Sequence, residues 1–349
     1  MVRCDGSPEI GLGHVVRCVA LADELHHEHG WQIMFVMREG PLAFEVVKEK
    51  GYLVEDPITC GPPVPYGVWL QQLSDKVGAQ ILILDVRDDF PRAAVQAFRN
   101  QGLLVVTLDD PTDRRLDADL AFYPPIPQLK KMDWAGFTGQ LHSGWEWVLL
   151  RREFSSQPPK PANSPPKILV SMGGSDPAGM TLKAVSALER LHQNFTGVII
   201  LGPGFRQLQA LEHSLDRARH SFEVRRNVTR IWEEMAQADL AIGSFGVTAY
   251  ELAAMGIPAL LLSLTSDHAE SASAFSAEGM AVNLGVHEQV SENALAEEIA
   301  KLLEDRPRWV SMGRKARETI DGAGAARVVR VITSAIKERN DCCQSAARA

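Results

Sequence analysis

The sequence lacks the features that mark membrane and secreted proteins. No stretch approaches the roughly 18 uninterrupted apolar residues of a membrane span, and the longest apolar run, 257–264, is of strand length and contains a proline. The N-terminus, from Met1 to Asp5, has neither the apolar segment nor the cleavage site of a secretory signal. We therefore expect a cytoplasmic protein without an integral membrane segment.

The sequence also has few cysteines and fewer basic than acidic residues. The five cysteines show no C-x-x-C spacing, so we expect reduced thiols and no bound metal. The 36 basic residues are outnumbered by 44 acidic ones, for a net charge of −8, which argues against nucleic acid as a partner. A nucleotide ligand is compatible with this charge, because backbone N–H groups at a helix N-terminus can hold a diphosphate.

The chain does contain an alternation of short apolar runs and helix-period segments, which is the pattern of βαβ units around parallel sheets. Its 349 residues exceed what one compact core usually supports. A polar, proline-rich stretch interrupts the alternation and cannot be a helix interior or a central strand. We predict an α/β protein with two doubly wound, Rossmann-like domains facing across a cleft. The predicted divisions are an N-terminal domain at 1–154, a linker at 155–166, a nucleotide-binding domain at 167–320, and a C-terminal helix with a polar tail at 321–349.

The expected elements follow from the same patterns. Buried strands are predicted at 33–37, 81–85, 103–108, 167–172, 197–201, 240–242 and 259–262. Helices are predicted at 15–29, 180–193, 229–237, 247–255, 269–278, 292–304 and 309–338, the last interrupted near 321–324. Because doubly wound folds bind ligands at the carboxyl ends of their strands, the polar residues after these strands are the site candidates.

The first candidate is the turn Gly11-Leu12-Gly13, which leads into a helix with His14 at its start and Arg17 one turn on. Glycine leaves no Cβ between backbone and ligand, so a sugar or a phosphate can approach closely. An imidazole at this place is suited to proton transfer near neutrality. The same residues also fit a tight turn before a helix with a solvated histidine. Without a third glycine the turn is not a dinucleotide fingerprint, and we expect no cofactor.

Two small-residue turns follow predicted strands in the second half. Gly173-Gly174 lets the backbone approach a phosphate or a sugar hydroxyl, and Ser175 or Asp176 can equally cap the helix that follows. The stretch 244–248 opens another helix, whose N–H groups form an anion site for a diphosphate. Glu251, one turn in, is either a partner for ribose hydroxyls or an ordinary helix carboxylate.

Further acidic residues stand at other strand ends. Asp267 and His268 follow a strand and either bind a sugar or, in the case of Asp267, cap the next helix. Asp85 and Asp109 end two strands of the first half, where they either steady an imidazolium or a sugar hydroxyl or form turns.

Taken together, these motifs resemble the pseudaminic-acid-pathway UDP-sugar hydrolases and the related spore-coat polysaccharide proteins. That superfamily is similar to the peptidoglycan N-acetylglucosaminyltransferase and has the glycosyltransferase-B fold. The resemblance is carried, in order, by Arg3–Gly6, Ile10–His14, Arg17-Cys18, Leu21-Ala22, Gly144–Phe154, Met172–Asp176, Ser244–Glu251 and Gly256–Pro258.

The resemblance implies a metal-independent, inverting hydrolysis of a UDP-linked diacetamido-trideoxyhexose, with His14 as the catalytic residue that activates water. It implies nucleotide binding by Ser244, Phe245, Gly246, Val247, Thr248 and Glu251. We assign substrate binding to Asp5, Gly11, Gly13, Arg17, Asp85, Gly173, Gly174, Asp267 and His268. The expected partner is a UDP-sugar, and no protein partner can be inferred from the sequence.

The chain departs from the hydrolase pattern at two places. Asp85-Val86-Arg87 stands where the hydrolases have Asp-His-Tyr, and Asp267-His268 stands where they have Asn-Gln. Since both places would touch the sugar, two alternatives remain open: an inverting glycosyltransferase that uses the same UDP-sugar donor, and a non-catalytic nucleotide-sugar-binding protein.

Overall fold

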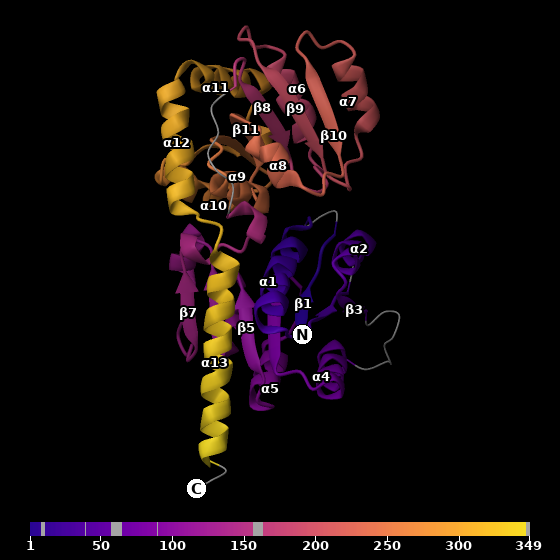
Figure 1. The fold of residues 1–349 in the computed structure, drawn as a ribbon, viewed down its shortest axis with the longest axis vertical. Coiled ribbons are helices and arrows are strands. Elements are labelled where there is room, and N and C mark those ends of the chain that lie inside the picture. The colour runs from indigo at the N-terminus through magenta and orange to yellow at the C-terminus, as the bar shows by residue number, and fades with distance from the viewer. Residues whose placement is uncertain (8–10, 39, 57–64, 89, 156–162, 347–349) are drawn as a thin grey trace.

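The computed structural model describes residues 1–7, 11–38, 40–56, 65–88, 90–155 and 163–346. Within these residues the chain forms two fully parallel sheets, one in each half (Figure 1). Helices cover both sheets, so the strands are buried and their sequences read as near-continuous apolar runs. The predicted α/β class with two doubly wound domains is confirmed.

The first domain is built on a seven-stranded sheet in the order β3-β2-β1-β4-β5-β6-β7. Its strands are β1 (Val2–Cys4), β2 (Met34–Val36), β3 (Leu53–Glu55), β4 (Ile81–Asp85), β5 (Leu104–Leu108), β6 (Leu120–Tyr123) and β7 (Gln140–Ser143). Its helices are α1 (Gly13–His29), α2 (Pro41–Glu49), α4 (Tyr66–Val77) and α5 (Arg92–Asn100), with short 3₁₀ segments at η1 (Asp113–Asp117), η2 (Pro127–Lys131), η3 (Trp145–Trp147) and η4 (Arg152–Phe154).

The second domain has a six-stranded sheet in the order β10-β9-β8-β11-β12-β13. Its strands are β8 (Lys167–Ser171), β9 (Thr196–Leu201), β10 (Phe222–Arg226), β11 (Leu240–Ser244), β12 (Ala259–Ser263) and β13 (Ala281–Val286). Its helices are α6 (Met180–Leu188), α7 (Leu208–Leu215), α8 (Ile231–Ala236), α9 (Val247–Ala254), α10 (Ser266–Ala277), α11 (Glu292–Glu304) and α12 (Arg306–Thr319), with η5 (His287–Gln289) as a 3₁₀ segment.

The last helix, α13 (Gly324–Ala346), returns to the first domain. It packs along α1, and Val328, Val329 and Ile332 join the apolar core that α1 shares with the first sheet. Figure 1 shows α13 running along the first domain, far from the sheet of the second. The C-terminal residues therefore stabilise the domain that holds the N-terminus.

All of the predicted strands are present, but the prediction missed six others: β1, β3, β6, β7, β10 and β13. Four of the six are edge strands. Three of these are short or polar, as in the exposed Glu-Val-Arg-Arg of β10, and in β13 an asparagine and a glycine interrupt the apolar run. The helix predicted at 180–193 ends earlier, at Leu188, and the one predicted at 309–338 is two helices, the second reaching Ala346. Most of the predicted linker, 156–162, lies outside the described residues, and the predicted domain boundaries stay predictions.

Candidate functional site

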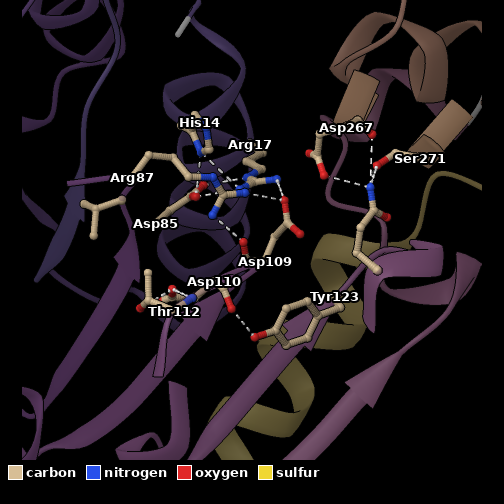
Figure 2. A network of polar contacts seen from close by, with 12 residues as sticks. His14, Arg17, Asp85, Arg87, Asp109, Asp110, Thr112, Tyr123, Asp267 and Ser271 are labelled. Carbon is tan, nitrogen blue, oxygen red and sulfur yellow. Dashed lines mark hydrogen bonds and ion pairs between the residues drawn. The ribbon is translucent and has the colours of Figure 1, made fainter. Parts of the chain in front are cut away.

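The first element of the site is a contact between the start of α1 and the end of β4. Three residues of α1, at helix positions i, i+3 and i+4, lie on one face and all reach the carboxylate of Asp85. The Nδ1 atom of His14 lies 2.7 Å from Asp85 Oδ1, and Arg17 donates from Nε and Nη2 at 2.5 Å each. Cys18 Sγ lies 3.5 Å from Asp85 Oδ2. Figure 2 shows His14 and Arg17 converging on Asp85.

Asp85 is fully buried, with 0% of its surface exposed. Burial alone would raise the pKa of Asp85, but the charges and hydrogen bonds of Arg17 and His14 outweigh it and hold that pKa well below its ordinary value. The carboxylate is therefore ionised at neutral pH. The oxygens of this buried carboxylate are occupied by donors of the chain itself, so the geometry favours the expectation that Asp85 steadies an imidazolium, and its contact with a substrate stays a prediction.

Two groups lie against Nδ1 of His14: Asp85 Oδ1, which can only accept, at 2.7 Å, and Arg17 Nη2, which can only donate, at 3.1 Å. We assign the proton to Nδ1 because the contact with the carboxylate is the shorter one and Arg17 Nη2 already donates to Asp85 Oδ1 at 2.5 Å. The neutral imidazole then has its lone pair on Nε2. About 15% of the His14 side chain is exposed, which leaves the ring accessible to a small ligand. This is the arrangement of a general base oriented by a buried carboxylate.

A second carboxylate continues the network. Asp109, at the end of β5, accepts from Arg17 Nη1 at 3.3 Å and from Arg87 Nη2 at 2.8 Å. Its backbone has φ of +52°, an uncommon conformation for a non-glycine residue. Arg87 also donates to the backbone oxygen of Asp109. Together these contacts form a network of alternating charges that runs from His14 to the half-exposed Arg87.

The second domain brings an uncapped helix N-terminus to this place. Gly246 precedes α9 with φ of +154°, and no side chain caps the helix among the described residues. A Cβ added to Gly13 would lie 3.2 Å from Val247 Cγ2, so the start of α1 touches the start of α9. The predicted histidine and the predicted anion site are thus neighbours, although they are more than 230 positions apart in the chain.

Glu251 lies one turn into α9 and is buried. Burial raises its pKa, and Arg151 partly offsets this effect with Nη2 at 3.3 Å from Oε1. Arg151 is not among the predicted site residues, because its partner stands 100 positions away in the chain. Cation and carboxylate together form a polar pair at the base of the predicted nucleotide site.

The glycine turn after β8 packs closely on its neighbours. Gly173 has φ of +76°, and a Cβ on Gly174 would lie 3.4 Å from Leu12 of the loop before α1. The N-cap position of α6 is Gly179, and neither Ser175 nor Asp176 occupies it. The carboxylate of Asp176 still accepts from the first N–H groups of the helix, those of Met180 and Thr181, at 2.8 Å each. The glycine turn therefore faces the loop that leads into His14.

Residues of the first two turns of α10 contact the first domain directly. Gln128, in η2, donates from Nε2 to Asp267 O and Oδ1 at 3.0 Å each and to Ser271 Oγ at 2.9 Å. Figure 2 shows Asp267 and Ser271 opposite the His14 network. The interpretation of Asp267 as a helix cap is wrong, because Thr265 caps α10 by accepting from the N–H of His268. Burial lowers the pKa of His268, whose imidazole faces Asp267, Arg87, His14 and Asp109.

Asp5 lies in a different cluster from His14. It accepts from Arg3 Nη2 at 2.5 Å and from the backbone N–H of Arg38 at 2.7 Å. Gly11 has φ of +76° and donates to the backbone oxygen of Ser7, while Ile10 of the same motif lies outside the described residues. The structure thus unites His14, Arg17 and Asp85 in one network and ties Asp5 to Arg3 instead.

The described residues contain neither a cluster of metal ligands nor a membrane-spanning helix. No group of three or more histidine, cysteine, aspartate or glutamate side chains is placed to hold a metal ion in this part of the chain. None of the described helices is both long and apolar enough to cross a bilayer.

The sequence matches no protein-family model. It is 26% identical over 167 residues to the spore coat polysaccharide biosynthesis protein SpsG of Bacillus subtilis, covering 47% of this chain and 49% of that protein. It is 32% identical over 175 residues to the UDP-N-acetylglucosamine–N-acetylmuramyl-(pentapeptide) pyrophosphoryl-undecaprenol N-acetylglucosamine transferase of Alkalilimnicola ehrlichii, covering 49% of each chain. The chain matches about half the length of these curated relatives.

Solved structures resemble nearly the whole chain. MurG of Acinetobacter baumannii superposes with a TM-score of 0.69 at 17% identity, covering 95% of this chain and 99% of that one. The S. aureus MnaA structure with UDP superposes with a TM-score of 0.65 at 11% identity, covering 97% and 96%. The predicted glycosyltransferase-B fold is confirmed.

Proposed function

We propose that the protein is an enzyme that acts on a UDP-sugar bound between its two domains. The observation that carries this proposal is the contact between two half-sites: His14, oriented by Asp85, and the uncapped start of α9. The first supplies a base and the second an anion site, and a reaction that releases a nucleoside diphosphate needs both. Two neighbours support the choice of ligand by name, the MnaA structure with UDP and the UDP-N-acetylglucosamine-dependent transferase.

The reaction we propose is hydrolysis with inversion at the anomeric carbon. His14 Nε2 takes a proton from a water molecule while the water oxygen bonds to that carbon. The bond from the anomeric carbon to the β-phosphate oxygen breaks, and UDP leaves with the electron pair. Asp85 stabilises the imidazolium that forms, and the first N–H groups of α9 stabilise the charge developing on the diphosphate. In this scheme the chain itself provides the stabilisation that a metal ion would otherwise give.

The finer assignments come from the resemblance. A diacetamido-trideoxyhexose would be the sugar, the free sugar would enter nonulosonic-acid or surface-polysaccharide biosynthesis, and Glu251 would accept hydrogen bonds from the ribose. The name of the spore-coat relative supports a polysaccharide pathway.

Glycosyl transfer is the second candidate, because one relative is named as a transferase and MurG resembles this chain over nearly its full length. In transfer, His14 would deprotonate an acceptor hydroxyl instead of water. A binding protein without activity is the weakest candidate, because binding alone does not require an oriented imidazole beside the anion site.

A panel of UDP- and CMP-sugars, scored for nucleotide release with and without chelator, tests the proposal. We expect release from a UDP-sugar in the absence of any acceptor, unaffected by chelator and abolished in His14→Ala. If nucleotide release depended on an added acceptor, the reaction would be glycosyl transfer and not hydrolysis. Full turnover by His14→Ala would exclude this histidine as the base.

A further inference from the structure

The carboxylate of Asp85 has as many donors as it has acceptor positions. An ionised carboxylate offers about four lone-pair sites. Oδ1 accepts from His14 Nδ1 and Arg17 Nη2, and Oδ2 accepts from Arg17 Nε. The fourth contact is Cys18 Sγ, 3.5 Å from Oδ2. No water can take its place, because Asp85 and Cys18 are each 0% exposed.

Cys18 carries the hydrogen that this contact requires. Burial raises the pKa of its thiol well above the ordinary value, and the neighbouring Cys4 and Asp85 raise it further. The side chain is therefore a thiol at neutral pH, and Cys18 donates to the carboxylate. A thiol is a weak donor, but a charged acceptor in a dry interior strengthens the bond.

We propose that Cys18 is a positioning residue, whose thiol fixes the orientation of Asp85 and, through it, the imidazole of His14. Without this donor, Oδ2 is held from one side only, by Arg17 Nε, and the carboxylate can rotate away from Nδ1. Because a carboxylate that orients a base acts through its geometry, such a rotation lowers the rate without touching the substrate. This inference rests on the proposed function of His14 and extends it to a residue behind the site.

Three variants separate the donor from simple packing. Cys18→Ala removes the hydrogen-bond donor and leaves a small cavity, and Cys18→Ser keeps a donor at the same place. Val19→Ala creates a cavity at the next position of α1, where the side chain is also buried, and it is the packing control. We expect Cys18→Ala to lower kcat about 5- to 10-fold with KM unchanged, and the other two to stay within about twofold of the wild type.

A second measurement does not depend on turnover. The proton on His14 Nδ1 lies in a charge-assisted hydrogen bond to Asp85, so it should give a downfield proton resonance in NMR spectra, assigned by its loss in His14→Gln. We expect this resonance to shift upfield or broaden in Cys18→Ala and to recover in Cys18→Ser.

The outcomes distinguish the two proposals. An unchanged resonance in Cys18→Ala, or a Cys18→Ser variant as impaired as Cys18→Ala, overturns the positioning role. If no nucleotide-sugar is turned over by the wild type, the proposed function fails, and the resonance still decides whether Cys18 positions Asp85 and His14.

Discussion

Arg17 donates two hydrogen bonds to Asp85, one to each carboxylate oxygen and each at 2.5 Å. This bidentate contact neutralises a buried carboxylate and at the same time leaves Oδ1 available to His14 Nδ1. One residue pair therefore serves both the stability of the first domain and the orientation of the candidate base.

Asp85→Asn removes the charge that stabilises an imidazolium and replaces one acceptor oxygen by an amide donor, so His14 loses its fixed tautomer. We expect kcat to fall about 10²- to 10⁴-fold, with the Kd for UDP unchanged because Asp85 is buried behind His14. Steady-state kinetics and calorimetric titration with UDP measure the two quantities.

Asp119→Asn is the matched control for this variant. Asp119 is also a largely buried carboxylate, 11% exposed, that is held by Arg99 and Arg339, but it immediately precedes β6 and so lies at the opposite end of the sheet from Asp85. We expect its kcat to stay within about twofold of the wild type. An Asp85→Asn enzyme with wild-type kcat would contradict the role given to the carboxylate.

Glu251→Gln should weaken UDP binding and stabilise the protein. Burial raises the pKa of Glu251 in the folded state, so the unfolded state ionises first as the pH rises. The stability contributed by this group is therefore complete below the ordinary glutamate pKa of about 4.3 and is lost as the pH rises through the higher folded value. At neutral pH the wild type has lost that contribution to stability. The Glu251→Gln variant keeps it, because a glutamine side chain does not ionise.

We expect the free energy of unfolding of Glu251→Gln to exceed that of the wild type by more at about pH 7 than at about pH 5, while the Kd for UDP rises about tenfold. Urea unfolding at both pH values and calorimetry test the two halves. Glu24→Gln is the control, since Glu24 is buried and paired with Arg152 away from the candidate site. A Glu251→Gln variant that binds UDP with the wild-type Kd would show that Glu251 does not take part in nucleotide binding.

Gln128→Ala should loosen the contact between the domains. A single amide nitrogen of Gln128 lies within hydrogen-bond distance of three oxygens of α10, so its loss favours arrangements in which the domains have separated. We expect KM for the UDP-sugar to rise about 3- to 10-fold and the radius of gyration from X-ray scattering to increase.

Lys131→Ala is the matched control on the same segment. Lys131 pairs with Glu270 of α10, but its side chain is 69% exposed, and such surface pairs contribute little. Equal effects of the two substitutions would show that the predicted loosening is not specific to the amide of Gln128.

The parts of the site that the sequence predicts are those built from local patterns. His14 and Arg17 follow from helix spacing after a glycine turn, and the anion site follows from a strand that ends in small residues. Gln128 and Arg151 were not predicted as site residues, because their partners lie 139 and 100 positions away in the chain. The contact of Asp85 with Arg17 was not predicted for a related reason: a carboxylate at a strand end gives no sign of the arginine that a helix will bring to it.

Gly324→Ala tests how the C-terminal helix is held. The chain returns to the first domain at Gly324, where an added Cβ would lie 2.0 Å from the carbonyl oxygen of Val148. No rotamer can relieve a collision between a Cβ and a backbone oxygen, so α13 must shift from α1. We expect the free energy of unfolding to fall by about 2–3 kcal/mol and hydrogen exchange in α13 to accelerate.

Gly30→Ala is the control that separates this collision from the general cost of replacing a glycine. A Cβ added to Gly30 meets nothing within 4 Å, but the φ of +66° is strained for alanine. We therefore expect the free energy of unfolding to fall by about 1 kcal/mol, with no change in hydrogen exchange in α13. If α13 exchange in Gly324→Ala matched the wild type, the close approach to Val148 would not be what docks the helix.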